Sequence, residues 1–156
     1  IDVKPHQVTL VPDAEDQLTS NHGWDTIKHK DYLKEIINEL KKHNIRTSIF
    51  IDPVSEQIEN AVATGTDRIE LYTEFFAKNF DNDPEKAISS FTKSADLAAN
   101  LGLGINAGHD LNLENIQYFK QNISQLDEVS IGHALIAESL YEGLPTVIDK
   151  YLKFLQ

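Results

Sequence analysis

The sequence predicts an α/β fold in which about five parallel strands alternate with helices, as in an incomplete (β/α)8 TIM barrel. Short apolar or β-branched runs alternate with helical patterns five times along 156 residues, and no two-residue hairpin turn separates them. Each unit takes about 30 residues, the spacing of an eight-unit barrel of roughly 250 residues. We therefore expect residues 1–156 to be a single domain that corresponds to the C-terminal portion of such a barrel, strands 4 to 8.

The boundaries of the units follow from local sequence signals. Asp52-Pro53 and Asp83-Pro84 each combine a capping carboxylate with a proline in the first helical turn, so both predict helix starts. The segments 13–30 and 74–82 have no hydrophobic period and are expected to be irregular. The strands are predicted at 7–11, 46–52, 68–73, 104–108 and 128–133, and the helices at 31–43, 53–65, 84–100, 112–122, 134–141 and 144–155.

Composition excludes several classes of function. The net charge of −11 argues against non-specific binding to nucleic acid or to an anionic membrane. The chain has no cysteine, which excludes disulfides and thiolate metal sites. No apolar run reaches the roughly 20 residues of a membrane span, and no signal peptide is visible, so the expected compartment is the cytoplasm.

The ends of the chain carry a further expectation. The sequence starts at Ile1 and contains no methionine, which is typical of the remainder of a longer protein. Five units would leave two unpaired strand edges, so we expect an open, C-shaped sheet. We also expect the chain on its own to aggregate or to depend on association, and to lack activity.

A strand-end histidine organises the second half of the chain. Residues 104–111 read as a short buried strand that breaks at Gly108, with His109 where the strand ends. In parallel sheets, ligands bind at the carboxyl ends of strands. The same design recurs one unit later, where Gly132 precedes His133. A glycine before each histidine lets the backbone approach a ligand and leaves amide groups for a phosphate.

Each of these features also has a structural interpretation. Either histidine could be a satisfied core residue, and Asp110 could simply be the charge at the start of the next helix. A metal held by His109, Asp110 and His133 would need further ligands that the sequence does not identify.

A carboxylate on the third strand is the other candidate for chemistry. Glu70 lies among apolar residues and needs a partner, solvent or a site. The structural alternative is a salt bridge to Arg68, two residues away on the same face. Tyr72 and Thr73 follow as candidate substrate contacts, while Thr19, in the long loop after the first strand, carries little weight by itself.

At these residues the chain resembles the pyridoxine 5′-phosphate synthase family of (β/α)8 enzymes, and the resemblance runs the whole length in order. Asn-Ala-Gly-His and Ile-Gly-His-Ala at this spacing, with Ile-Glu upstream, are together specific. The motifs are Lys4-Pro-His, Leu10-Val-Pro, Leu18-Thr19, Ser48-Ile-Phe-Ile-Asp52, Ile69-Glu70 followed by Thr73, Asn106-Ala-Gly-His109 and Ile131-Gly-His-Ala134.

The resemblance implies a transferase-type reaction of vitamin B6 biosynthesis. In this family 3-amino-2-oxopropyl phosphate condenses with 1-deoxy-D-xylulose 5-phosphate to give pyridoxine 5′-phosphate, phosphate and water. Glu70 then resembles the carboxylate that stabilises charge near the reacting centre, and His109 resembles the proton donor. Four positions resemble substrate contacts: Thr19, Asp110, Gly132 and His133. The last three resemble the positions that hold a phosphate group.

The family also sets expectations beyond these residues. It implies no cofactor and no metal, two small phosphorylated substrates, and a homo-oligomer, an octamer by resemblance. Some relatives carry glycine at Asp110, whose carboxylate would repel a phosphate if it pointed inward. The family's first three strands bring further catalytic residues that this chain does not contain, so the parent protein is expected to be the enzyme.

Two other functions stay open on the sequence alone. One is a different sugar-phosphate enzyme on the same scaffold: an isomerase, an epimerase or an aldolase. A Schiff-base aldolase would need a strand-end lysine, and none of the five strands ends in one. The other is a non-catalytic phosphate-binding domain.

Overall fold

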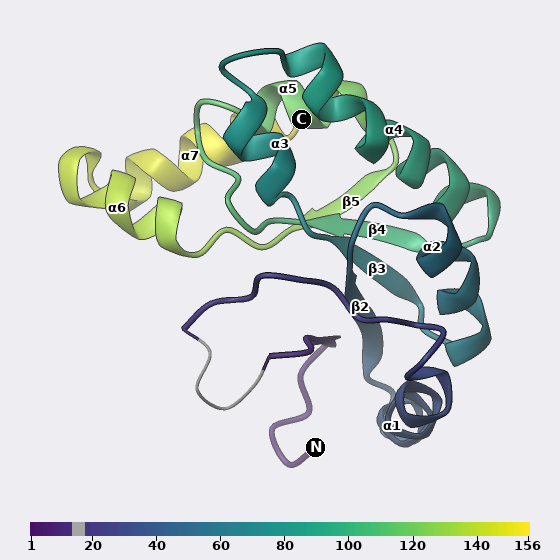
Figure 1. Cartoon of the computed structure of the whole chain (residues 1–156). Coiled ribbons are helices and arrows are strands. Elements are labelled where there is room, and N and C mark those ends of the chain that lie inside the picture. Colours follow the sequence, from purple (N-terminus) through teal and green to yellow (C-terminus); the bar gives the residue numbers. More distant parts are fainter. Residues whose placement is uncertain (14–17) are drawn as a thin grey trace.

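The computed structural model describes residues 1–13 and 18–156 and contains one five-stranded sheet (Figure 1). Each strand pairs in parallel with the next one along the chain, in the order β1-β2-β3-β4-β5. The strands are β1 (Gln7–Leu10), β2 (Arg46–Ile51), β3 (Arg68–Leu71), β4 (Gly104–Ala107) and β5 (Leu126–Val129). The predicted α/β fold of five parallel strands alternating with helices is confirmed, and the sheet is open.

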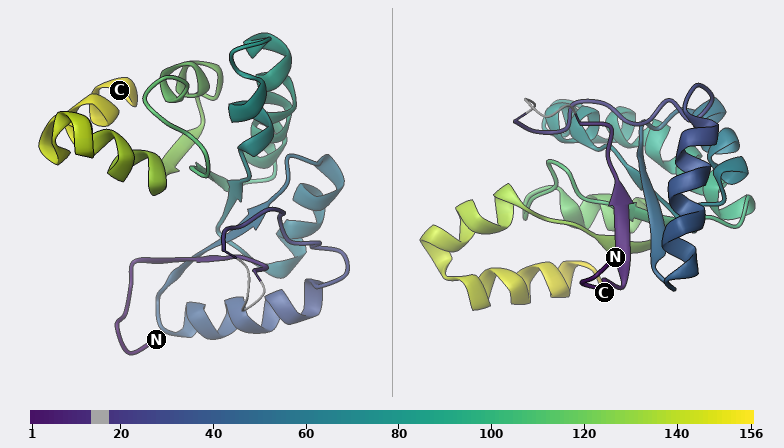
Figure 2. Two further views of the ribbon diagram at one scale, coloured as in Figure 1. Left: turned by 60° about the vertical axis from the view of Figure 1, so that its left-hand side comes forward. Right: turned by 90° about the horizontal axis from the view of Figure 1, so that it is seen from below.

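Helices connect the strands and cover one face of the curved sheet, and two more helices follow the last strand and extend beyond its edge, as two further views show (Figure 2). None of those in the described residues is long and apolar enough to cross a membrane. They are α1 (Lys30–Lys42), α2 (Ser55–Ala61), the 3-10 turn η1 (Val62–Thr64), α3 (Glu74–Asn79), α4 (Pro84–Asn100), α5 (Ile116–Asn122), α6 (His133–Glu142) and α7 (Leu144–Phe154).

The helix-covered face of the sheet is apolar. Alternate strand residues such as Ile51, Leu71 and Ile105 are fully buried in the main core against the helices. Phe76 of α3, Phe91 of α4 and Phe119 of α5 pack edge to face there, with ring centroids 5.1–6.1 Å apart. These three rings are among the largest fully buried side chains, so their packing holds α3, α4 and α5 against the sheet.

The two aspartate–proline pairs have different roles. Asp83 caps α4 as predicted, because its Oδ1 accepts a hydrogen bond from the Lys86 amide at 3.0 Å. Asp52 does not cap α2, which begins three residues later at Ser55. Its carboxylate instead accepts a bond from the Gly23 amide at 3.0 Å. The prediction for Asp52 was wrong because a distant loop supplies the donor that the local pattern assigned to a helix.

Two other sequence boundaries are corrected. The segment 74–82, predicted to be irregular, contains α3, because Phe76 is drawn into the core. The last strand ends at Val129 and not at His133, since the chain turns away after Ser130 to begin α6. This strand also carries Asp127 and Glu128, so the open edge that it forms is not apolar.

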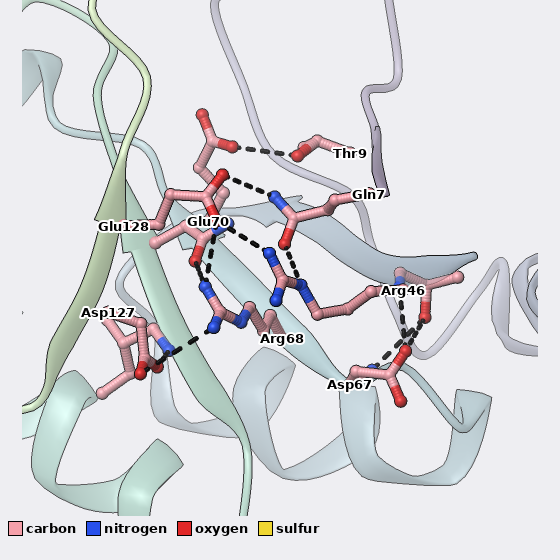
Figure 3. A network of polar contacts seen from close by, with 11 residues as sticks. Gln7, Thr9, Arg46, Asp67, Arg68, Glu70, Asp127 and Glu128 are labelled. Carbon is pink, nitrogen blue, oxygen red and sulfur yellow. Dashed lines mark hydrogen bonds and ion pairs between the residues drawn. The ribbon is translucent and has the colours of Figure 1, made fainter. Parts of the chain in front are cut away.

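The concave face of the sheet carries a polar network centred on Glu128 (Figure 3). Its carboxylate accepts hydrogen bonds from Gln7 at 3.0 Å, Arg46 at 2.9 Å and Arg68 at 3.2 Å. These partners come from β1, β2 and β3. The Arg68 guanidinium also donates to the buried Asn106 side chain at 2.9 Å. One side chain of β5 therefore holds the first three strands across the hollow of the sheet.

A glycine makes room for this network. An added Cβ at Gly104 of β4 would lie 2.7 Å from Cγ of Arg68 and 2.9 Å from a carboxylate oxygen of Asp127. Any side chain there would push the guanidinium away from Glu128. The space that Arg68 needs thus explains the glycine at the first position of β4.

The network generates the first prediction. Glu128→Gln keeps the shape of the side chain but removes the charge that pairs with Arg46 and with the mostly buried Arg68. We expect the free energy of unfolding, measured by urea titration, to fall by about 2 kcal/mol. The matched control is Glu39→Gln, which breaks an exposed pair with Lys42 and should cost less than about 0.5 kcal/mol. Equal losses in the two variants would contradict the role given to Glu128.

Candidate active site

A cavity of about 530 Å³ lies where the strands end, and all six predicted site residues line it. They come from the loop after β1, from β3, from the turn after β4, and from the segment after β5 that begins α6. The expectation that His109 and His133 line one cavity is confirmed, whereas the roles of the six residues stay predictions. The six are Thr19, Glu70, His109, Asp110, Gly132 and His133.

His109 is held at both ring nitrogens. Nε2 lies 2.9 Å from the hydroxyl oxygen of Thr19, and Nδ1 lies 2.8 Å from a carboxylate oxygen of Asp110. The Thr73 hydroxyl donates a hydrogen bond to the His109 backbone carbonyl. Ring and backbone are therefore fixed by separate contacts, which leaves little freedom for the imidazole to rotate.

Two aromatic rings pack against the imidazole. Tyr72 meets His109 edge to face, with ring centroids 5.3 Å apart, and Phe50 lies 6.1 Å from it. Burial raises the pKa of the Tyr72 phenol to about 12, with the nearby Glu74 carboxylate adding to the effect. Tyr72 and Thr73, predicted as substrate contacts, are buried and do not belong to the cavity lining. They support His109 instead.

Glu70 is the buried carboxylate of the site, with 7% of its surface exposed. One of its oxygens accepts a hydrogen bond from the Thr9 hydroxyl at 3.1 Å. Burial raises the pKa of Glu70, and the negative charge of Glu128 adds to this. The Thr9 hydrogen bond and His109 act in the opposite direction.

The alternative that Glu70 forms a salt bridge with Arg68 is wrong. Arg68 directs its guanidinium to Glu128, Asn106 and Asp127, and among the described residues no ion pair joins it to Glu70. The two side chains come from the same face of β3, but the guanidinium of Arg68 is directed toward Glu128 (Figure 3). Among the described residues, the mostly buried carboxylate of Glu70 therefore has no arginine or lysine partner.

The two glycines that precede the histidines differ in function. An added Cβ at Gly108 would lie 2.1 Å from the Ser130 carbonyl oxygen, so this glycine allows β4 and the end of β5 to approach. Gly132 has open space around its Cα. The expectation of a backbone open to a ligand therefore fits Gly132, while Gly108 is needed for packing.

His133 does not end a strand; it is the first residue of α6, with Gly132 at the N-cap position. Both residues are exposed and line the cavity. The first amides of a helix have no partner within the helix and attract anions. The free amides that the sequence analysis predicted for binding a phosphate are therefore those of a helix start, and not those of a strand end.

The loop that carries Thr19 is anchored to the end of β2. The Gly23 amide bonds to Asp52, and the Trp24 amide donates to the Phe50 carbonyl at 2.9 Å. An added Cβ at Gly23 would lie 2.4 Å from the Asp52 nitrogen, so only glycine allows this approach. The anchoring places the end of the long loop beside the strand ends.

Sequence reasoning missed Thr9, which lines the cavity and bonds to Glu70. The available signal was the alternation within β1, where Gln7 and Thr9 are polar and Val8 and Leu10 are apolar. In the described residues no group of three or more histidine, aspartate or glutamate side chains could hold a metal ion.

Comparisons with known proteins agree along the whole chain. The family model described as pyridoxal phosphate biosynthesis protein PdxJ matches residues 1–156. The pyridoxine 5′-phosphate synthase of Christiangramia forsetii is 61% identical over 156 residues, which is 100% of this chain and 66% of that protein. The synthase of Flavobacterium johnsoniae is 62% identical with the same coverage. The chain thus spans about two thirds of the length of these relatives.

Solved structures give a weaker likeness. The HMG-CoA lyase from Brucella melitensis aligns with a TM-score of 0.48 at 18% identity, over 72% of this chain and 43% of that one. So distant a match adds nothing to the fold described above.

The glycine geometry generates a prediction with a built-in control. Gly108→Ala places a methyl group against the Ser130 carbonyl and should lower the free energy of unfolding by about 3 kcal/mol or more. Gly132→Ala meets open space and should leave stability within about 0.5 kcal/mol of the wild type. Thermal unfolding of both variants measures the difference. A Gly108→Ala protein as stable as Gly132→Ala would show that the strands need no close approach.

Burial of Glu70 predicts a pH dependence of stability. Because its pKa is raised in the folded protein, the unfolded chain loses the proton first, and this group's contribution to stability falls as pH rises above its ordinary value of 4.5. Glu70→Gln cannot ionise. Its gain in unfolding free energy over the wild type should be negligible near pH 4 and should grow toward pH 7 in urea titrations. A difference that does not change with pH would contradict the burial argument.

Proposed function

The chain belongs to the pyridoxal phosphate biosynthesis protein PdxJ family, and from this premise we propose that the protein containing it is a pyridoxine 5′-phosphate synthase. The reaction joins 3-amino-2-oxopropyl phosphate to 1-deoxy-D-xylulose 5-phosphate, giving pyridoxine 5′-phosphate, phosphate and water. The observation that carries the proposal is the convergence of six residues from four separate segments on one cavity. A volume of about 530 Å³ is in the usual range for small-molecule sites.

His109 is proposed as the proton donor. Condensation and ring closure require several proton transfers to and from nitrogen and oxygen, and histidine is suited to these near neutral pH. The ring is held by Thr19 at Nε2 and by Asp110 at Nδ1. Thr19 lines the cavity, so it lies next to both the imidazole and the place proposed for the substrate.

Glu70 is proposed as the carboxylate that stabilises positive charge on the substrate. It lies in the cavity wall without an arginine or lysine partner among the described residues, and burial raises its pKa. A cationic amine or imine that arrives beside it would favour the ionised form. The carboxylate would then stabilise the positive charge that develops on the substrate, because no arginine or lysine among the described residues already pairs with it.

The phosphate end of a substrate is assigned to the start of α6. Gly132 and His133 supply the first amides of this helix at the cavity wall. Gly132 leaves room for a phosphate, since nothing lies within 4 Å of where its Cβ would be. The backbone of Asp110 completes the assignment, because its carboxylate is turned to His109.

The family resemblance extends the proposal to the assembly. We propose that the enzyme works in the cytoplasm as a homo-oligomer, in which the five units form part of a closed eight-strand barrel. Every residue of α6 is exposed or half-buried, and Leu140 and Tyr141 are 81% and 92% exposed. A neighbouring protein segment that covered this apolar surface would stabilise such an assembly.

The proposed activity is tested on the intact protein. Both substrates are supplied together and each alone, and pyridoxine 5′-phosphate and released phosphate are measured. We expect product only with both substrates. Consumption of the sugar phosphate alone would favour an isomerase or epimerase, and binding without turnover would favour a non-catalytic domain.

Glu70→Gln tests the role of the buried carboxylate in the same assay. We expect turnover to fall about 10²-fold, because an electrostatic stabiliser is lost, while stability at neutral pH does not fall. The control is Glu85→Gln on the exposed first turn of α4, which should change turnover by less than about twofold. Unchanged turnover per folded molecule in Glu70→Gln would refute a catalytic role.

A further inference from the structure

The side chains of Thr19, His109 and Asp110 form a continuous row along one wall of the cavity. The hydroxyl oxygen of Thr19 lies 2.9 Å from Nε2, and the carboxylate of Asp110 lies 2.8 Å from Nδ1. Both distances are those of good hydrogen bonds. The row joins a residue of the first loop to the turn after β4, ninety positions further along the chain.

The chemistry of the two end groups decides where the ring carries its proton. An ionised carboxylate only accepts hydrogen bonds, so Nδ1 must be the protonated nitrogen that faces Asp110. In the neutral ring Nε2 is then the unprotonated nitrogen. The Thr19 hydroxyl can donate to it, since a hydroxyl is able to play either part. Asp110 therefore determines the tautomer of the ring, and the Thr19 hydroxyl adapts by donating to Nε2.

The backbone supports a specific use of the Asp110 side chain. Its φ is +65°, in the left-handed region, which a glycine adopts without strain and an L-residue adopts less readily. Aspartate tolerates this region better than most residues. In this conformation the carboxylate turns back to the imidazole ring of the preceding residue.

We propose that Asp110 is a positioning residue that holds neutral His109 in the Nδ1–H tautomer, so that Nε2 is the nitrogen that exchanges protons inside the cavity. The second half of this statement rests on the proposed function. When Nε2 takes up a proton, the Nδ1–H bond to Asp110 persists, and the ring keeps its orientation in both states. The carboxylate thereby acts on the histidine and not on the substrate.

The tautomer is measured directly by long-range ¹H–¹⁵N NMR of the ¹⁵N-histidine-labelled intact protein, with His109 assigned from a His109→Gln sample. We expect Nδ1 to show the shift of a protonated ring nitrogen and Nε2 that of an unprotonated one, at a pH where the ring is neutral. Asp110→Gly should shift the population to the Nε2–H form. It should fold at least as well as the wild type, because glycine suits the positive φ.

A second variant separates the two ends of the row. Thr19→Val removes the hydroxyl but leaves Asp110, so the Nδ1–H tautomer should remain. A wild-type ring in the Nε2–H form would overturn the proposal. It would also be overturned by an Asp110→Gly ring that keeps the wild-type tautomer, or by a Thr19→Val ring that changes it.

Kinetics then test the functional half. Asp110→Gly should lower kcat about tenfold with little change in KM for either phosphorylated substrate. A raised KM with unchanged kcat would make Asp110 a substrate contact and would overturn the positioning role. Absence of turnover in the wild type would refute the proposed function alone, since the tautomer is read without any substrate.

Discussion

The carboxylate of Glu128 is the contact on which the rest of this structure depends. It reaches from β5 across the hollow of the sheet to Gln7 on β1, Arg46 on β2 and Arg68 on β3. A charge on a concave, half-buried surface is tolerated only when it is paired and hydrogen-bonded. The pairing therefore favours one curvature of the sheet, and this curvature brings the ends of the strands around a common cavity.

The same surface is divided into two layers with opposite electrostatics. The lower layer pairs its own charges, since Glu128 engages both arginines and Asp127 also pairs with Arg68. One step toward the strand ends, Glu70 accepts a hydrogen bond from the Thr9 hydroxyl and has no arginine or lysine partner among the described residues, and burial raises its pKa. A carboxylate left in this condition is costly for stability and useful for binding a cationic group. This destabilising carboxylate lies where the substrate is proposed to react.

Glycines and loop anchors set the geometry of the upper layer. Gly108 lets the turn that holds His109 approach Ser130, and Gly23 lets the first loop approach Asp52. Each contact fixes a segment that carries one end of the row from Thr19 through His109 to Asp110. The imidazole is thus positioned by its own hydrogen bonds and by the packing of the loops that carry its partners. Such supporting contacts make a site that is built on loops rigid.

The sequence by itself determined the alternation of strands and helices, the cap at Asp83 and the set of polar residues at the strand ends, because periodicity and capping are local properties. It could not determine partners. Thr9 finds Glu70 over 61 positions, Asp52 binds a loop amide in place of capping a helix, and Arg68 turns to Glu128 and not to Glu70. Those choices depend on the curvature of the open sheet, because it brings together donors and acceptors that lie far apart in the sequence.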